Sequence, residues 1–256
     1  MKSNPKKKPA LLFRALKRTV RFFYPKIEVV GAENLPEGEA IIVGNHSQLH
    51  GPITTELYFP GYRYTWCAGQ MMRTKEVPAY AYRDFWSQKP KIVRPFFKAL
   101  SYIIAPLASF IFNNADAISV DHDSRIVSTF KATVKLLDDG ARVIIFPEHY
   151  TPRNNIVYDF QDSFIDVAKL YYKKSGKDLQ FVPLYIAPRL KKMFIGKPIT
   201  FNHTAPIDQE RKRIAEYLMD EITAMARALP EHKVVPYANL PKKRHLKNTD
   251  NDKTPQ

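Results

Sequence analysis

The chain has 256 residues, enough for one large α/β domain or two small ones, and 45% of them are hydrophobic, which excludes a largely disordered protein. The net charge of +15 favours anionic partners, such as lipid headgroups, acidic carrier proteins, nucleotide-bearing cofactors or nucleic acid, without choosing among them. A single cysteine, Cys67, excludes an internal disulfide and a multi-cysteine zinc site, and it fits a reducing compartment.

The first 26 residues carry nine lysines and arginines and no acidic residue. Arg14, Lys17, Arg18 and Arg21 follow helical spacing, and the apolar residues fall on the opposite side. This is the pattern of a basic amphipathic helix that lies on a membrane surface. The same apolar side could instead pack against the rest of the protein, and the pattern does not separate the two.

From residue 27 onward, short apolar runs alternate with helical patterns, which predicts an α/β fold with a mainly parallel central sheet flanked by helices. A helix that begins at Ser124 and stops at Gly140 leads into one of these runs, and a second helix covers residues 208–228. Cys67 is predicted to be a buried packing residue. The predicted strands are 27–30, 40–44, 64–68, 118–120, 142–146, 181–186 and 193–201.

We expect three parts along the chain. These are a membrane-surface helix over residues 1–26, one domain over residues 27–240, and a basic polar tail over residues 241–256 without fixed structure. Pro230 and a lysine-rich stretch after the last helix suggest the final boundary.

The most apolar segment covers residues 96–112, but Lys98 and Pro106 interrupt it. It therefore falls short of the roughly 20 uninterrupted apolar residues that a membrane-spanning helix needs. We predict a buried or interfacial hairpin, with a pair of core helices as the alternative, in a protein that lies on a bilayer and does not cross it.

Polar residues follow two predicted strands, at the place where ligands collect in α/β sheets. Asn45-His46 follows the strand over 40–44, and Glu148 follows the strand over 142–146. A histidine at such a place can remove a proton from a hydroxyl group near neutral pH, although a hydrogen-bonded structural histidine is the simpler alternative. His46 and His50 have the spacing of a zinc-binding pair, but the glutamate of that motif is missing, so no metal is expected.

Four motifs occur in the order and approximate spacing of the phospholipid/glycerol acyltransferase family, whose best-known members acylate lysophosphatidic acid. The chain resembles this family over roughly residues 27–201. The motifs are Asn45-His46, Phe146-Pro147-Glu148, Val182-Pro183 and Ile195-Gly196-Lys197-Pro198-Ile199.

The resemblance implies that His46 is the general base of an acyl transfer, with acyl-CoA or an acyl-carrier protein as co-substrate and no further cofactor. Glu148 would be the second catalytic residue, which orients a base or closes the acceptor pocket. Contacts with substrate are expected from the other residues in or beside the motifs, namely Asn45, His50, His122, Arg125, His149, Thr151 and Arg153.

The chain departs from the family where an aspartate would orient the histidine, because Gly51 stands at that position. Another acid must then reach His46, or catalysis is weakened, since removal of a triad carboxylate can cost about 10⁴ in rate. The candidates are Asp84, Asp121 and Asp159.

Two further departures concern the arginines that the family uses. Thr151 stands at one of these positions, in the segment His149-Tyr150-Thr151, and His122 stands at the other. Because histidines enter the motif segments, we predict a site rebuilt around imidazoles. Incidental surface histidines beside a decayed site are the alternative.

We therefore expect a peripheral protein at the cytoplasmic face of the cell membrane that acylates a hydroxyl of a lysophospholipid-type acceptor. Its expected partners are the anionic membrane surface, the acyl donor and the lysolipid. The alternative is a membrane-associated homologue that binds lipid or acyl thioester without turnover. Nucleic acid is not an expected partner, because no nucleic-acid module accompanies the basic residues.

Overall fold

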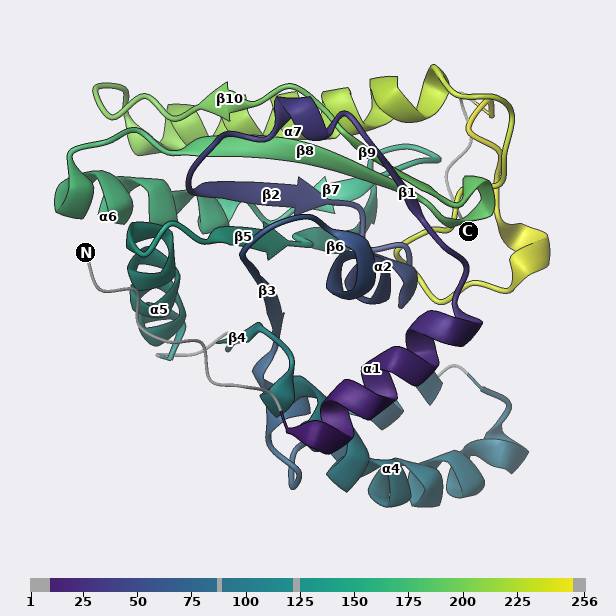
Figure 1. Ribbon diagram of the computed structural model, residues 1–256. Coiled ribbons are helices and arrows are strands. Elements are labelled where there is room, and N and C mark those ends of the chain that lie inside the picture. The colour runs from purple at the N-terminus through teal and green to yellow at the C-terminus, as the bar shows by residue number, and fades with distance from the viewer. Residues whose placement is uncertain (1–9, 87–88, 122–124, 251–256) are drawn as a thin grey trace.

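The computed structural model describes residues 10–86, 89–121 and 125–250, and Figure 1 shows a central sheet with helices on both sides. The helices are α1 (Leu11–Phe23), α2 (His50–Tyr58), α3 (Val77–Ala81), α4 (Arg94–Asn114), α5 (Ile126–Asp138), α6 (Asp166–Ser175) and α7 (Ile207–Arg227). The strands are β1 (Glu28–Val30), β2 (Ala40–Gly44), β3 (Arg63–Ala68), β4 (Ala117–Val120), β5 (Arg142–Ile145), β6 (Glu148–Pro152), β7 (Tyr158–Phe160), β8 (Gln180–Ala187), β9 (Lys192–Ile195) and β10 (Ile199–Thr200). Short helical turns are η1 (Ala32–Asn34), η2 (Gly69–Met72), η3 (Tyr82–Trp86), η4 (Lys91–Val93), η5 (Asp162–Ile165), η6 (Pro188–Leu190) and η7 (Lys242–Arg244).

The central sheet has the strand order β1-β9-β8-β2-β5-β3-β4, with β10 paired to β8. Strand β2 lies between β8 and β5 and runs parallel to both, and β5, β3 and β4 continue the parallel arrangement. Only the β8–β9 and β8–β10 pairs in this sheet are antiparallel. The predicted α/β fold with a mainly parallel sheet flanked by helices is therefore confirmed.

Alternation of side chains along the strands gives the sheet an apolar layer on each face. Ile41 and Val43 of β2 join the core that α5, α6 and α7 complete. Ala40 and Ile42 point to the other face, into a core with Phe59 at the end of α2. The predicted helices that end at Gly140 and cover 208–228 are confirmed as α5 and α7.

The predicted strand over 193–201 is wrong as one element, because the chain breaks it into β9 and β10. Pro198 cannot donate a hydrogen bond to a sheet. Gly196 lies so close to β8 that a Cβ atom there would be 2.8 Å from the Pro183 ring, and its N–H donates to the Pro183 carbonyl over 2.9 Å. The motif over residues 195–199 therefore contains the turn between β9 and β10.

The predicted hairpin over 96–112 is also wrong, because α4 is one continuous helix that contains Pro106. The small residues Ser101, Ala105 and Ser109 form its buried face, and Pro106 lies on an exposed side. Among the described residues, the stretch 91–114 alone is long and apolar enough to cross a membrane, with a mean hydropathy of 1.5 over its 18-residue window, and a single such helix is weak evidence for a span.

Cys67 on β3 is partly buried. Burial, together with the nearby Asp121 carboxylate, raises the pKa of its thiol to about 12. The thiol therefore stays neutral at physiological pH and is not a nucleophile.

Residues 241–250, which the sequence predicts to be without fixed structure, fold back onto the domain. Asn248 is fully buried, and its amide accepts from the His232 N–H over 2.9 Å and donates to the Ala226 carbonyl over 2.9 Å. Val234 N–H donates to the Leu246 carbonyl over 2.8 Å. The sequence hides this packing because the buried side chains are polar and lie among exposed lysines.

We predict that Asn248→Ala lowers the free energy of unfolding by about 1–3 kcal/mol, because it leaves buried backbone groups without hydrogen-bond partners. Urea unfolding of the purified protein measures this loss. The matched control is Lys243→Ala, which changes an exposed residue in the same segment. Equal stability of the two variants would show that the segment does not pack as described.

Candidate functional site

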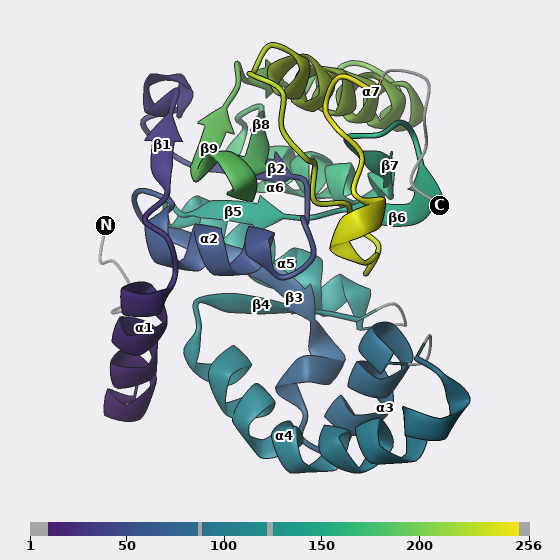
Figure 2. The ribbon, with the colours of Figure 1, turned by 90° about the vertical axis from the view of Figure 1, so that its right-hand side faces the viewer.

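The two family-like strand ends lie side by side at the carboxyl edge of the sheet, which Figure 2 views from the front. Val43 of β2 is paired with Ile145 of β5 in parallel register. The segments that begin at Asn45 and Phe146 therefore leave neighbouring strands at the same level. This is the place where open α/β sheets collect ligands.

Asn45 fastens the end of β2 to β8. Its side-chain oxygen accepts from the Ile186 N–H over 2.7 Å, and its amide nitrogen donates to the Ile186 carbonyl over 3.1 Å and to Ser47 Oγ over 2.7 Å. The side chain is buried. Its polar atoms are thus used within the protein, which gives Asn45 a structural role in place of the predicted contact with substrate.

The turn that follows His46 is strained. Ser47 and Gln48 have φ angles of 47° and 54°, in the left-handed region that side-chain-bearing residues rarely occupy. Gln48 donates from Nε2 to the carbonyl of Leu240 over 3.3 Å, which ties the turn to the C-terminal segment. Such strain persists only where surrounding contacts hold it, and it is common at functional sites.

Gly51 permits this turn to close. Its N–H donates to the His46 carbonyl over 3.0 Å, and a Cβ atom at Gly51 would be only 2.4 Å from the same carbonyl oxygen. The Phe146 ring would be 3.1 Å from that Cβ. The backbone here leaves no room for the aspartate that the family resemblance implies.

Glu148 is buried and joins the two sides of the site through backbone groups. One carboxylate oxygen accepts from the His46 N–H over 2.5 Å, and the other accepts from the Tyr158 N–H over 3.0 Å. Burial raises the pKa of Glu148 to about 7, and the two N–H donors oppose this rise only in part. Glu148 therefore positions the backbone of His46, whereas the sequence predicted a direct role toward a base or an acceptor.

The His46 imidazole is surrounded by aromatic rings. Phe146 and Tyr237 both meet it edge to face, with ring centroids 5.4 Å and 5.8 Å away. Burial lowers the pKa of His46 to about 4, and the backbone of Gln48 opposes this only in part. The imidazole is consequently neutral at pH 7, which is the form that accepts a proton.

No carboxylate in the described part of the chain replaces the missing aspartate. His46 Nδ1 is buried and has no hydrogen-bond partner. Asp121 instead pairs with Arg73 over 2.5 Å, and Asp84 pairs with Arg83 over 2.9 Å. Asp159 makes no hydrogen bond to His46 either. Packing, and not a charge, holds this imidazole.

Most of the other predicted contact residues lie away from His46. His149 is exposed beside Tyr150, and Thr151 is exposed on the same strand. Arg153 pairs with Asp220 of α7 over 2.9 Å. Arg125 is exposed and lies 3.4 Å from Asp121. His122 lies outside the described residues.

His50, four residues after His46, belongs to a group of basic residues that lie near one another. Its Nδ1 lies 2.7 Å from the Tyr24 hydroxyl. Burial lowers the pKa of His50, and the nearby Arg189, Lys242 and His245 lower it further. We call these four residues the cationic rim. Three chain segments far apart in sequence form it, so the motifs could not reveal Lys242 and His245.

Tyr237 is the residue that sequence reasoning missed most clearly. Besides His46, its ring meets Tyr150 at 5.7 Å and Tyr158 at 5.6 Å. Together these aromatic rings cover the site on the side where the C-terminal segment lies. The single available signal is an aromatic residue inside the apolar pentapeptide Val234-Val235-Pro236-Tyr237-Ala238, just before the lysine-rich tail.

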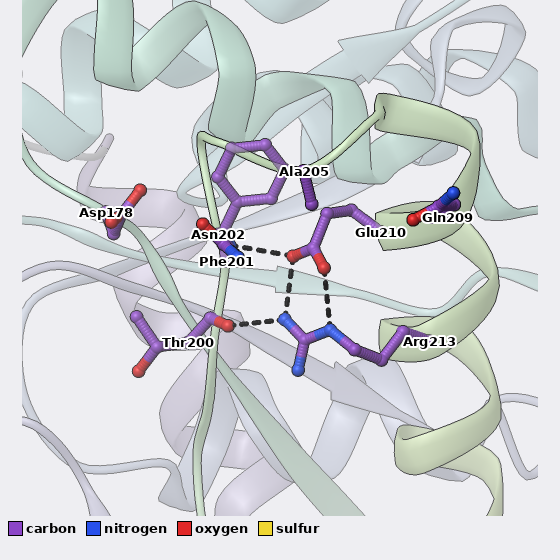
Figure 3. Close-up of a pocket in the computed structure, with 8 residues that line it drawn as sticks. All are labelled: Asp178, Thr200, Phe201, Asn202, Ala205, Gln209, Glu210 and Arg213. Atoms are coloured by element: carbon purple, nitrogen blue, oxygen red, sulfur yellow. Dashed lines mark hydrogen bonds and ion pairs between the residues drawn. The ribbon is translucent and has the colours of Figure 1, made fainter.

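A cavity of about 660 Å³ lies elsewhere, between β10 and the start of α7 (Figure 3). Thr200, which lines the cavity, is paired with the first residue of β8, and Asn45 binds near the last residue of the same strand. The cavity therefore lies at the opposite end of β8 from the candidate site. Its charged groups are already satisfied, since Arg213 binds Glu210 over 2.7 Å and Glu210 accepts from the Asn202 N–H. The cavity therefore offers no free charged group of its own to a ligand.

Within residues 10–86, 89–121 and 125–250, no group of three or more His, Cys, Asp or Glu side chains is placed to hold a metal ion. The site thus contains a neutral histidine, a buried carboxyl group that binds the backbone of this histidine, and the cationic rim. These groups suit proton transfer and the binding of an anion.

No protein-family model matches the chain, and no curated protein matches it in sequence. Among solved structures, the chain is similar to the 1-acyl-sn-glycerophosphate (LPA) acyltransferase PlsC from Thermotoga maritima. The identity is 17%, the match covers 84% of this chain and 80% of that one, and the TM-score is 0.45. At this level of similarity, any statement about function has to rest on the motifs and on the geometry of the site.

We predict that Gly51→Ala destabilises the protein by about 1–3 kcal/mol, because the added Cβ overlaps the His46 carbonyl. Gly51→Asp adds a larger side chain at the same point and does not restore an orienting carboxylate. Denaturant unfolding measures both effects. Gly38→Ala is the matched control, since a Cβ at Gly38 has nothing within 4 Å. A Gly51→Ala variant as stable as this control would contradict the described turn.

Proposed function

We propose that this protein is an acyltransferase that moves a fatty acyl group from acyl-CoA or an acyl-carrier thioester to the hydroxyl of a lysophospholipid-type glycerolipid, with His46 as the general base. One observation carries the proposal. The two strand ends that resemble the acyltransferase family meet at one edge of the sheet, and Glu148 of one binds the backbone of His46 of the other.

The chemistry follows from the neutral state of His46. The imidazole takes the proton of the acceptor hydroxyl while the hydroxyl oxygen attacks the thioester carbonyl. The carbon–sulfur bond then breaks, and the imidazolium returns the proton to the departing thiolate. The products are an ester and a free thiol. A pKa of about 4 makes His46 a weak base but its protonated form a strong acid, which favours the second step.

The absence of an orienting carboxylate has a cost in rate. Loss of that carboxylate in a triad costs about 10⁴ in turnover, chiefly because the imidazole is no longer fixed in orientation and tautomer. Here the rings of Phe146 and Tyr237 limit the orientation of His46 without a hydrogen bond to a carboxylate. We expect turnover that is slow but depends on His46.

The cationic rim supports an anionic substrate. Arg189 and Lys242 are exposed and make no ion pair with a described residue, and His50 and His245 lie near them. These cations can serve the phosphate of the acceptor, the phosphates of CoA or the acidic surface of a carrier protein. Arginines at the two family positions, where this chain has Thr151 and His122, are then not required for binding an anion.

We place this activity at the cytoplasmic face of the cell membrane, with the protein bound peripherally. The lone cysteine supports a reducing compartment, and the excess of positive charge supports contact with anionic lipid.

A second candidate is a protein that binds lipid or acyl thioester without turnover. The unpartnered Nδ1 of His46 and the missing aspartate favour it. Incubation with labelled acyl-CoA or acyl-carrier protein and a panel of lysolipids separates the two functions. New acylated lipid supports the transferase, whereas binding without product supports the second candidate.

We predict that His46→Ala lowers acyl transfer by about 10²–10⁴, the usual contribution of a general base. In the wild-type protein, the remaining kcat/KM should be lost as the pH drops through about 4, because protonation of His46 removes the base and its pKa is lowered to that value. Steady-state kinetics across pH measures both effects. His203→Ala, which changes a histidine stacked on Tyr172 far from the site, is the control. Unchanged transfer by His46→Ala would refute the assignment.

A further inference from the structure

Helices α1 and α4 lie toward one end of the molecule (Figures 1 and 2). Both helices carry large apolar side chains that are exposed. On α4 and the turn before it, Ile92 is 89% exposed, Ile103 74% and Phe96 66%. Leu107 is also exposed. These four residues recur at helical spacing and therefore form one stripe along the helix. Contiguous exposed apolar surface of this kind marks an interaction site.

The opposite face of α4 is fastened to the protein by polar contacts. Ser109 Oγ lies 2.6 Å from Thr74 Oγ1, and Asn113 donates to the Met72 carbonyl over 2.7 Å. Ser101 and Ala105 on the same face are buried. These contacts fix α4 along the surface of the domain. A spanning helix would have to break them and place this polar face in lipid.

The start of helix α1 lies near the end of α4, at the same end of the molecule. The Ala10 N–H donates to Asn114 Oδ1 at the end of α4 over 3.2 Å. Phe13 is buried, which fixes α1 to the domain, while Leu12 and Phe22 are 67% and 82% exposed. The two alternatives for this helix, packing on the domain and exposure of apolar residues, are thus both present in one element.

The charges on these helices have one sign. Residues 11–23 and 91–114 contain seven lysines and arginines and no aspartate or glutamate. Lys17 pairs with Glu56, and Arg21 lies over the Tyr58 ring. Lys91 and Lys98 are exposed on the same segment as the apolar stripe of α4. Exposed apolar side chains on segments whose charges are all positive are complementary to an anionic bilayer surface, where lysines reach headgroups and apolar residues enter the acyl region.

We propose that α1 and α4 together form a docking face for anionic phospholipid bilayers, with α4 lying in the membrane interface parallel to the bilayer plane. The face extends the membrane contact expected for the N-terminal helix to α4, the apolar segment for which the sequence left a buried and an interfacial position open. The inference concerns binding alone and holds whether or not the protein transfers acyl groups.

The test is flotation of the full-length protein with phosphatidylcholine vesicles that do or do not contain phosphatidylglycerol. The triple variant Phe96→Ser, Ile103→Ser and Leu107→Ser should bind anionic vesicles about a hundredfold or more weakly, since each buried aliphatic or aromatic side chain is worth roughly tenfold. Added salt should also weaken the binding of the wild-type protein to anionic vesicles.

The matched control is Val127→Ser with Leu170→Ser, which removes exposed apolar residues from α5 and α6. It should bind vesicles like the wild-type protein. Far-UV circular dichroism and thermal unfolding should be unchanged in both variants, because every altered side chain is exposed. Wild-type binding by the triple variant would overturn the proposal, as would salt-sensitive binding to nucleic acid without binding to vesicles.

The depth of α4 in the bilayer can be measured from the fluorescence of Trp86, whose ring stacks on Phe97 of α4 with the ring centroids 5.4 Å apart. In a Trp66→Phe background, lipids brominated near the headgroup should quench its fluorescence more strongly than lipids brominated near the chain ends. Stronger quenching by the deep bromines would show that α4 enters the membrane core and would contradict an interfacial helix.

Discussion

The site depends on the buried carboxyl group of Glu148 and its two backbone hydrogen bonds. It connects the end of β2 at His46 with β7 at Tyr158, so the sheet and the small β6–β7 ribbon meet at a fixed distance. A buried carboxyl group is costly to ionise, and its pKa near 7 reflects that cost. Backbone N–H groups of His46 and Tyr158 stabilise this carboxyl group by hydrogen bonds. The backbone at His46 must therefore keep one position, and this constrains the turn that follows.

The same constraint explains how a histidine can serve as base without a charged partner. A close approach at Gly51 excludes the carboxylate, and the rings of Phe146 and Tyr237 replace it by contact. Desolvation lowers the pKa of the imidazole far below its ordinary value, so the imidazole is neutral near pH 7. Orientation through packing is weaker than orientation through a charged hydrogen bond, so the expected outcome is a slower transferase.

The sequence predicted what depends on local pattern and could not predict what depends on distant contacts. Apolar runs predicted the sheet, and polar residues directly after two predicted strands pointed to His46 and Glu148. Pro106 suggested a break in α4, but one missing backbone donor on an exposed side does not stop a helix that is packed along its other face. His245 comes from a segment that looks solvated in the sequence, although polar residues such as Asn248 hold it on the domain, and Tyr237 directly precedes that segment. For Glu148 the sequence predicted that it orients a base or closes the acceptor pocket, whereas the structure shows a hydrogen bond from the His46 backbone.

The state of His46 tests the account most directly. Titration of the imidazole by heteronuclear NMR, with its signal identified by its loss in His46→Ala, should give a pKa near 4 in the wild-type protein. In Tyr237→Ala the aromatic cover is opened to water, and the pKa should rise toward the ordinary value of 6.5, whereas Tyr237→Phe should leave it low. A wild-type pKa of about 6.5, unaffected by Tyr237→Ala, would show that His46 is not a buried neutral base.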